Sequence, residues 1–281
     1  MPLVFLQKIK SIIAPKSQVI RRKDTVYKQL QNEHVLGAYV FSCKELNANQ
    51  PLFNDGLPAL IFMPKITDTV HLTKKGERME FNAAWACCGV INDTHWHVPQ
   101  DLEYLLVIRF KPASFYSIFG IDPKVFQANP IQNLIDLVDD RWAQVFTEMY
   151  QREVVTDKLS FLDQVLDQCN ADDNYPHILN LAVAYIDEKK GNTTVRDVLN
   201  QLGKRVNSKW LYRNFVKYIG VSPKKYISLQ RFIYTYSDYM DHKSNHRFDV
   251  ALHSGYYDYN HFFKDFKRYI GLTPSQHMLG E

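Results

Sequence analysis

Positively charged side chains recur in the last third of the chain with the same spacing in two places. Arg213 and Lys217 lie four residues apart, and Lys264 and Arg268 repeat that spacing 51 residues later. Residues four apart lie on one side of a helix, so each pair would present two cations together. Guanidinium and ammonium groups bind phosphates and the acceptor atoms of guanine. The pattern therefore indicates a polyanionic partner.

Each pair belongs to a longer repeat whose other residues start and stop a helix. A short polar residue that can cap a helix comes first, and two apolar residues four apart follow. A glycine then ends the helix, and Ser-Pro or Thr-Pro starts the next one. We therefore predict two capped helices with basic outer faces. The first copy contains Asn207, Leu211, Arg213, Phe215, Lys217, Gly220, Ser222 and Pro223, and the second contains Asp258, Phe262, Lys264, Phe266, Arg268, Gly271, Thr273 and Pro274.

The charge of the chain is unevenly distributed along its 281 residues. Residues 177–281 carry sixteen Lys and Arg against nine Asp and Glu, a balance of +7, whereas the whole chain carries +4. The preceding residues therefore sum to −3. A basic module joined to a mildly acidic one favours a polyanion as partner of the module alone. The four cysteines show no CxxC spacing, and no apolar run approaches the ~20 residues of a membrane helix. We expect a cytoplasmic, nucleoid-associated protein with no membrane contact.

The sequence before residue 177 predicts β-strands followed by helices. Short apolar runs at 35–41, 57–63, 79–90 and 104–110 are separated by turn signals, which predicts a barrel or sandwich. Apolar residues at helical spacing predict helices at 114–119, 131–138, 141–151 and 159–169. A polar segment, 170–176, ends in proline and indicates a linker. The expected fold is therefore α+β in two domains. Residues 1–172 form the first, β-rich at 35–110 and helical at 114–169, and 173–281 form an all-α second domain.

The C-terminal region resembles the DNA-binding domain of AraC-family transcriptional regulators. The residues that carry the resemblance are the small residues Ala251 and Gly255, the Gly255-Tyr256 turn and the closing Gly271-x-Thr273-Pro274-Ser275. The resemblance covers roughly residues 177–281 and implies two helix-turn-helix motifs joined by a helix over residues 223–240. The first motif departs from the family pattern, because Gly203-Lys204-Arg205 lengthens the turn between Val198-Leu199 and the next cap. A fainter resemblance to a sensor-like domain of such regulators involves Phe53, Asp55, Gly56, Arg109, Phe110, Lys111, Pro112, Phe119 and Gly120.

The resemblance implies which residues would contact DNA. Base contacts fall on Lys209, Tyr212 and Arg213 in the first motif, and on Tyr259, Asn260, Phe263 and Lys264 in the second. Phosphate contacts fall on Ser208, Lys217, Lys267 and Arg268. It also implies an effector-responsive regulator that is not an enzyme, with duplex DNA and a small-molecule effector as partners and with RNA polymerase and a second copy as candidate partners. The first domain would sense the effector or dimerise. No metal or cofactor is expected.

Two other chemistries remain open for the first domain. His95 and His97 share one side of a predicted strand and could bind a metal with His71, Glu103 or a cysteine. The adjacent Cys87 and Cys88 could form a reactive thiol site, since some alkylation-repair proteins carry an AraC-like module. The alternative function is therefore a metal- or thiol-dependent enzyme that the second domain targets to DNA.

Overall fold

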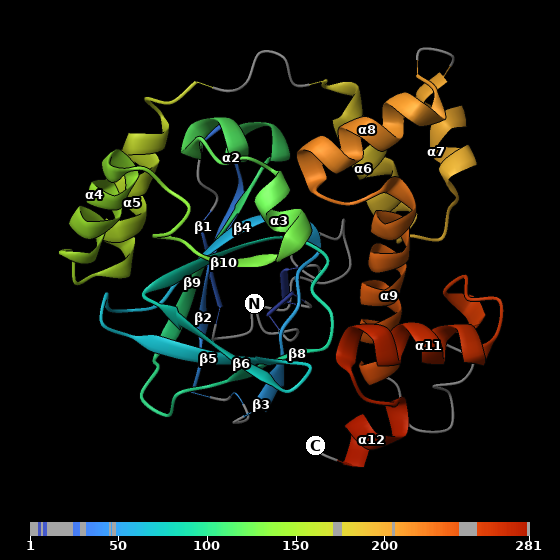
Figure 1. Ribbon diagram of the computed structural model, residues 1–281, viewed down its shortest axis with the longest axis horizontal. Helices are drawn as coiled ribbons and strands as arrows, with labels where there is room; N and C mark the ends of the chain where they lie inside the picture. Colours follow the sequence, from blue (N-terminus) through green and yellow to red (C-terminus); the bar gives the residue numbers. More distant parts are fainter. Residues whose placement is uncertain are drawn as a thin grey trace.

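A computed structural model of the chain describes residues 5–6, 8–9, 25–28, 32–44, 46, 49–170, 176–203, 206–241 and 252–279. It shows a β-rich N-terminal domain with flanking helices beside an all-helical C-terminal domain (Figure 1). The α+β class predicted from the sequence is thereby confirmed. The predicted boundary at residue 172 lies in 171–175, outside the described residues.

The N-terminal domain contains two antiparallel sheets. The six-stranded sheet has the order β1-β2-β9-β4-β7-β10, and the four-stranded sheet has the order β3-β8-β5-β6. The predicted run at 79–90 is divided at Ala83, where φ is 57°, so that its two halves join different sheets. The strands are β1 Thr25–Lys28, β2 Val35–Ser42, β3 Asn49–Pro51, β4 Gly56–Phe62, β5 Thr69–Lys74, β6 Glu77–Asn82, β7 Ala84–Gly89, β8 Thr94–His97, β9 Tyr104–Phe110 and β10 Ile131–Asn133.

Both faces of the six-stranded sheet are buried, and they belong to two different cores. Successive residues of a strand point to opposite faces. Ile61 and Val107 accordingly lie in the core shared with the other sheet, while Leu60 and Ile108 lie in the core under the helices. This explains why β4, β7 and β9 read as almost continuous apolar runs rather than as alternating ones.

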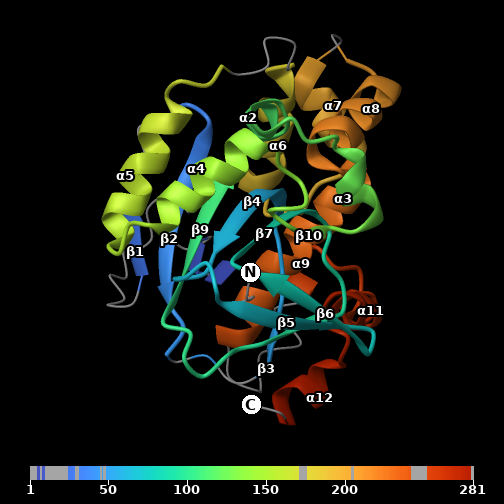
Figure 2. The same ribbon diagram turned by 60° about the vertical axis from the view of Figure 1, so that its left-hand side comes forward.

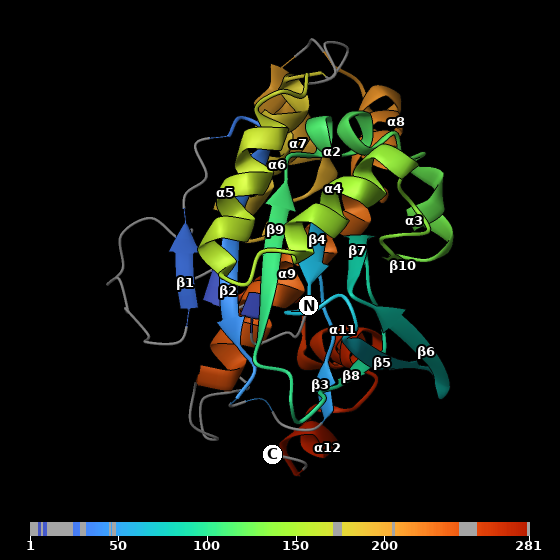
Figure 3. The same ribbon diagram turned by 90° about the vertical axis from the view of Figure 1, so that its left-hand side faces the viewer.

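Four helices follow the last long strand, and α4 and α5 lie in front of the sheet when it is viewed from the side (Figure 3). The prediction of a helix at 131–138 is wrong. Ile131–Asn133 forms β10, which pairs with β7, and the N–H of Leu134 donates to the carbonyl of Ala84. The free edge of β7 thus takes the backbone hydrogen bonds that a helix would have needed. The helices are α2 Pro112–Phe119, α3 Lys124–Ala128, α4 Asp140–Tyr150 and α5 Val155–Leu166.

The C-terminal domain confirms the helix signals of the repeat. Asn207 accepts a hydrogen bond from the N–H of Trp210 and Asp258 accepts one from the N–H of His261, at 2.9 and 2.7 Å. Gly220 and Gly271 end their helices in the left-handed region, with φ of 79° and 83°. The described helices are α6 Ile178–Glu188, α7 Val195–Leu202, α8 Ser208–Ile219, α9 Pro223–Asp241, α11 Tyr259–Ile270 and α12 Pro274–Leu279.

The long helix α9 joins the two domains as well as the two repeat copies. Leu229, Phe232 and Ile233 belong to the core between the two sheets, and the Phe232 ring lies 5.7 Å from the Phe53 ring. Tyr226 and Ile227 belong to the core of the helical domain. In Figure 2 α9 runs behind the sheets, with α8 near one end and α11 near the other. The N-terminal domain therefore packs against the helix that connects the two copies of the repeat.

Candidate nucleic-acid interface

The first repeated helix, α8, buries one face and exposes the predicted contacts on the other. Leu211, Phe215 and Ile219 are fully buried in the helical core. The side chain of Tyr212 is 56% exposed, while Trp210 is half-buried against the core. The predicted contact residues of this helix that the structure leaves exposed are Ser208, Lys209, Tyr212, Arg213 and Lys217.

The second repeated helix, α11, shows the same division with two differences. Phe262 and Phe266 are fully buried, and Asn260, Lys264, Lys267 and Arg268 are exposed. Tyr259 and Phe263 are only half-buried, with their rings 6.4 Å apart, and Tyr259 packs against the central core. These two aromatic residues therefore combine a packing role with their partly exposed surface.

A buried carboxylate that the sequence analysis did not single out holds α11 against α9. Asp265 is 4% exposed and accepts hydrogen bonds from the hydroxyls of Ser228 and Tyr256, at 3.2 and 3.3 Å. Arg268 donates to its other oxygen at 3.0 Å. Burial, and then the charge of Asp265, raise the pKa of Tyr256, so that its hydroxyl keeps the proton that it donates. A spacing signal was present, because Asp265 stands three residues after Phe262, on the buried face.

Arg231 of α9 connects the two motifs directly. Its guanidinium donates to the carbonyl of Gly191, in the turn between α6 and α7, at 3.2 Å. It also donates to the carbonyl of Gly255, in the turn that precedes α11, at 3.3 Å. One side chain thus hydrogen-bonds to the segment before α7 and to the segment before α11, which links the starts of the two motif regions through α9.

The N-terminal domain contacts the last turns of both α8 and α11 through one short segment. The thiol of Cys88 donates to the carbonyl of Ile219 at 3.5 Å, and the N–H of Asp93 donates to the carbonyl of Tyr269 at 3.0 Å. These contacts satisfy helix-end carbonyls that have no partner within their helices. The first two turns of α8 and α11, which carry the predicted base contacts, take no part in these two hydrogen bonds.

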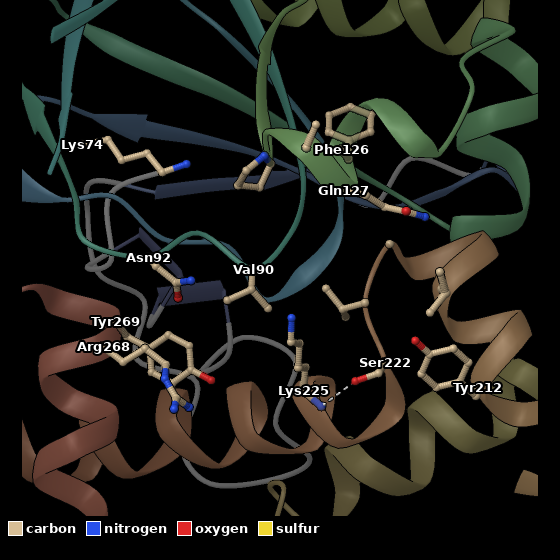
Figure 4. A pocket seen from close by; sticks show the side chains of 15 residues that line it. Lys74, Val90, Asn92, Phe126, Gln127, Tyr212, Ser222, Lys225, Arg268 and Tyr269 are labelled. Carbon is tan, nitrogen blue, oxygen red and sulfur yellow. Dashed lines mark hydrogen bonds between the residues drawn. The ribbon is translucent and has the colours of Figure 1, made fainter. Parts of the chain in front are cut away.

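A cavity of about 750 Å³ lies between these two contacts (Figure 4). Its walls come from both domains. Tyr212 and Val216 of α8, Arg268 of α11 and Lys225 of α9 line one side, while Lys74 and Gln127 belong to the opposite side. Two of the predicted DNA contacts, Tyr212 and Arg268, therefore also line an interdomain space.

The three histidines considered as candidate metal ligands lie in the four-stranded sheet, His71 in β5 and His95 and His97 in β8. His71 pairs with His97 across β5 and β8, and the His97 Nε2 lies 2.7 Å from the Thr73 hydroxyl. Burial lowers the pKa of His95. Within the described ranges, no three His, Cys, Asp or Glu side chains are grouped as metal ligands would be.

The two adjacent cysteines point to opposite faces of β7 and are fully buried. Burial raises the pKa of Cys87 to about 11 and that of Cys88 to about 12. The thiolate is the nucleophilic form of cysteine, and both residues are protonated near neutral pH, unlike the cysteine of a thiol-dependent enzyme. Cys88 instead serves as a hydrogen-bond donor at the domain contact.

We expect native protein treated with iodoacetamide at pH 8 to leave Cys43, Cys87 and Cys88 unmodified. All three are buried, and with pKa values of about 11 or 12 their thiolate fraction at pH 8 is at most about one in a thousand. Cys169 is partly exposed and is the thiol open to slow modification. Intact mass and peptide mapping measure the result, with guanidinium-unfolded protein as the control in which all four react. Rapid modification of Cys87 or Cys88 in the native protein would instead support the thiol-enzyme alternative.

The comparisons with known proteins bear on the C-terminal domain. Residues 205–278 match the family described as a helix-turn-helix domain. No curated protein sequence matches the chain. None of the helices within the described ranges combines the length and apolar character that a bilayer crossing demands.

Solved structures of ToxT from Vibrio cholerae share a general likeness with the whole chain. An apo single-residue variant from strain SCE256 is 14% identical with a TM-score of 0.45, and the match covers 88% of this chain and 98% of that one. ToxT from strain O395 is 15% identical with a TM-score of 0.43, covering 92% and 98%. A wild-type ToxT described as bound to an unsaturated fatty acid is 15% identical with a TM-score of 0.40, covering 92% and 96%. These values are too low to carry residue roles or ligands over to this chain.

The family match covers the region in which the repeat, the two capped helices and the connecting helix α9 were found. The C-terminal part of this chain therefore carries an AraC-type helix-turn-helix domain, at residues 205–278.

Proposed function

We propose that α8 and α11 enter two successive major-groove segments on one face of a DNA duplex. The observation that carries this proposal is the pair of registered helices, each exposing cations in its first turns while its last turn is held by the rest of the protein. Successive major grooves lie about 34 Å apart. The 19 residues of α9 span about 28 Å, so α9 and the widths of the two motifs together match that distance.

The proposed base contacts combine hydrogen bonding with apolar contact. Arg213, Lys209 and Lys264 would donate to guanine O6 and N7, and Asn260 would pair with adenine. Tyr212, Tyr259 and Phe263 would meet thymine methyl groups. Ser208, Lys217, Lys267 and Arg268 would contact phosphates, which sets register rather than sequence preference.

The N-terminal domain is proposed to sense a small-molecule effector. Its segment from Cys88 to Asp93 contacts the last turns of both α8 and α11, so a change in this domain would reach both helices at once. We assign residues 1–172 to sensing or dimerisation and 173–281 to DNA binding in a cytoplasmic, nucleoid-associated protein. A homodimer and contact with RNA polymerase are further proposals that follow from the family resemblance.

Replacement of Arg213 or Lys264 by alanine is expected to weaken binding to the preferred site by about 5- to 150-fold. This range corresponds to the 1–3 kcal/mol by which one bidentate base contact discriminates. Sites are first selected from a randomised duplex pool, and fluorescence anisotropy then gives the dissociation constants at a stated salt concentration. Each variant should relax sequence preference in its own half of the site only.

Two further variants separate base contacts from general charge. Lys267→Ala should weaken binding to all sequences alike and reduce the salt slope by about 1, as loss of one phosphate contact does. Lys65→Ala removes an exposed cation of the N-terminal domain and should leave affinity unchanged. Wild-type affinity and preference in both Arg213→Ala and Lys264→Ala would refute the contact assignment.

A further inference from the structure

The two repeated helices pack into different hydrophobic cores. Leu211 and Phe215 of α8 lie in the core of the helical domain, whereas Phe262 and Phe266 of α11 lie in the core between the two sheets. Helix α9 contributes its first turns to one core and its later turns to the other. Because packed helices can slide past one another by small amounts, a shared connecting helix does not by itself fix the position of α8 relative to α11.

The two motif regions also contact each other directly, through one pair of turns. The turn at Gly191 and Asn192 lies against the turn at Gly255, and both glycines are in the left-handed region, with φ of 70° and 84°. A Cβ on Gly255 would lie 2.3 Å from the side-chain oxygen of Asn192. These two turns therefore approach each other so closely that a side chain on Gly255 would collide with Asn192.

Arg231, near the middle of α9, holds this pair of turns together. Its Nε donates to the carbonyl of Gly191 at 3.2 Å, and its Nη1 donates to the carbonyl of Gly255 at 3.3 Å. The guanidinium carbon also lies 5.5 Å from the centre of the Tyr256 ring. A guanidinium is planar and its N–H groups point in fixed directions. Two carbonyls that it binds at once are therefore held at a fixed distance and angle, which a lysine ammonium cannot do.

We propose that Arg231 is a positioning residue that sets the distance and rotation between α8 and α11, and thereby the number of base pairs between the two DNA segments that they read. The inference rests on the proposed function, in which α8 and α11 enter successive major grooves. One additional base pair separates the two segments by a further ~3.4 Å and rotates one relative to the other by about 35°. A rigid pair of helices rejects that change, whereas a loosened pair accommodates it.

A distance measurement on the full chain without DNA tests the positioning itself. Spin labels are attached at Lys209→Cys and Asn260→Cys, two exposed positions at the starts of α8 and α11, with the partly exposed Cys169 replaced by serine. Pulsed dipolar spectroscopy then gives the distribution of distances between the labels. We expect a single narrow distribution with Arg231 present, and roughly twice that width in Arg231→Met and in Arg231→Lys, since small relative sliding becomes possible.

Duplexes of altered length test the consequence for DNA recognition. Starting from the selected duplex, one base pair is inserted between the two segments. The insertion should weaken binding of the wild type by about tenfold or more, on the order of a lost base contact. It should weaken binding of Arg231→Met and Arg231→Lys by less than about threefold. Base preference within each segment should stay unchanged in both variants, because Arg231 contacts no base in this proposal.

Tyr234→Phe is the matched control in the same helix. The Tyr234 hydroxyl donates to Asp187 of α6 at 3.1 Å, so this variant loses a hydrogen bond between α9 and the first motif region but keeps both bonds of Arg231. It should retain the wild-type distance distribution and the wild-type penalty for the inserted base pair. Circular dichroism confirms that each variant is folded, and Arg231→Lys alone decides the test if Arg231→Met does not fold.

The proposal is overturned if the folded Arg231 variants keep the narrow distance distribution, or if the inserted base pair costs them as much affinity as it costs the wild type. Equal broadening in Tyr234→Phe would also overturn it, because any weakened contact of α9 would then have the same effect. Failure of the proposed function gives a different result. A protein that selects no duplex refutes DNA reading by α8 and α11, while the distance distributions still show whether Arg231 holds the two helices in place.

Discussion

Replacement of Asp55 by asparagine is expected to lower the free energy of unfolding by about 3–5 kcal/mol, the usual cost of removing one partner of a buried ion pair. Asp55 and Arg109 form an ion pair in which the two side chains are 1% and 3% exposed. Burial, the largest single influence, would lower the pKa of Arg109, but the Asp55 carboxylate together with Tyr39 and Tyr226 raises that pKa, so the guanidinium stays charged. The substitution therefore leaves a positive charge in the interior without a counter-charge. Urea denaturation measures the change.

The position of this ion pair extends its effect to the DNA-binding helices. The side chain of Gln230 in α9 donates to the backbone carbonyl of Asp55 at 2.6 Å. The ring of Tyr226, also in α9, lies where a Cβ on Gly56 would meet it at 3.1 Å. Replacement of Asp55 should therefore weaken the packing of α9 against the N-terminal domain. We expect Asp55→Asn to bind DNA less tightly as well as to be less stable.

A double variant tests whether the unpaired charge of Arg109 or the altered side-chain packing causes the loss of stability. In Asp55→Asn/Arg109→Met no charge remains in the interior, and apolar replacement of a buried pair is often close to neutral. The double variant should therefore be more stable than Asp55→Asn alone. If the changes in unfolding free energy of Asp55→Asn and Arg109→Met, each measured alone, simply add in the double variant, the buried charge is not the cause of the destabilisation, and the explanation is wrong.

Replacement of Gly191 by alanine is expected to cost about 3 kcal/mol or more, because two penalties combine. Gly191 follows α6 with φ of 70°, a conformation that L-residues other than glycine adopt with strain. A Cβ there would lie 2.2 Å from the backbone N of Arg231 and 2.6 Å from the carbonyl of Ile227. Since both atoms belong to the backbone of α9, the turn must move away from that helix. Denaturant unfolding gives the stability and anisotropy gives the DNA affinity.

Gly120 supplies the matched control for this prediction. It ends α2 in the same left-handed region, with φ of 64°, and a Cβ there would meet nothing within 4 Å. Gly120→Ala should therefore show the backbone penalty alone, about 1 kcal/mol, and should leave DNA binding unchanged. Equal effects of the two substitutions would mean that the contact between the Gly191 turn and α9 is not close in solution.

Local signals in the sequence predicted the second domain better than the first. Caps, glycine stops and Ser/Thr-Pro starts act within one or two helical turns, so the limits of α8 and α11 could be inferred from Asn207, Gly220, Asp258 and Gly271. The failure at 131–138 has the opposite cause. The apolar spacing there suits a helix, but the unpaired edge of β7, more than forty residues earlier, takes the backbone hydrogen bonds of Ile131–Asn133.

The candidate site shows the same division between local and distant information. The exposed faces with Arg213 and Lys264 follow from helical spacing alone. The residues that hold those faces in place do not, because Asp265, Arg231 and Cys88 act on partners that are distant in sequence or lie on another helix. Asp55 and Arg109 were noted in a faint motif, yet only the folded chain shows that they are ion-paired beneath α9.

The amino-acid sequence by itself determined where α8 and α11 begin and end and which of their sides carries charge, since both properties depend on residues a few positions apart. Only the tertiary structure shows how those two helices are positioned relative to each other. It also shows that a cavity lined by cations lies between them and the first domain. Such features arise from pairs of surfaces separated by tens to hundreds of residues. Their contact depends on how the whole chain packs rather than on any local pattern.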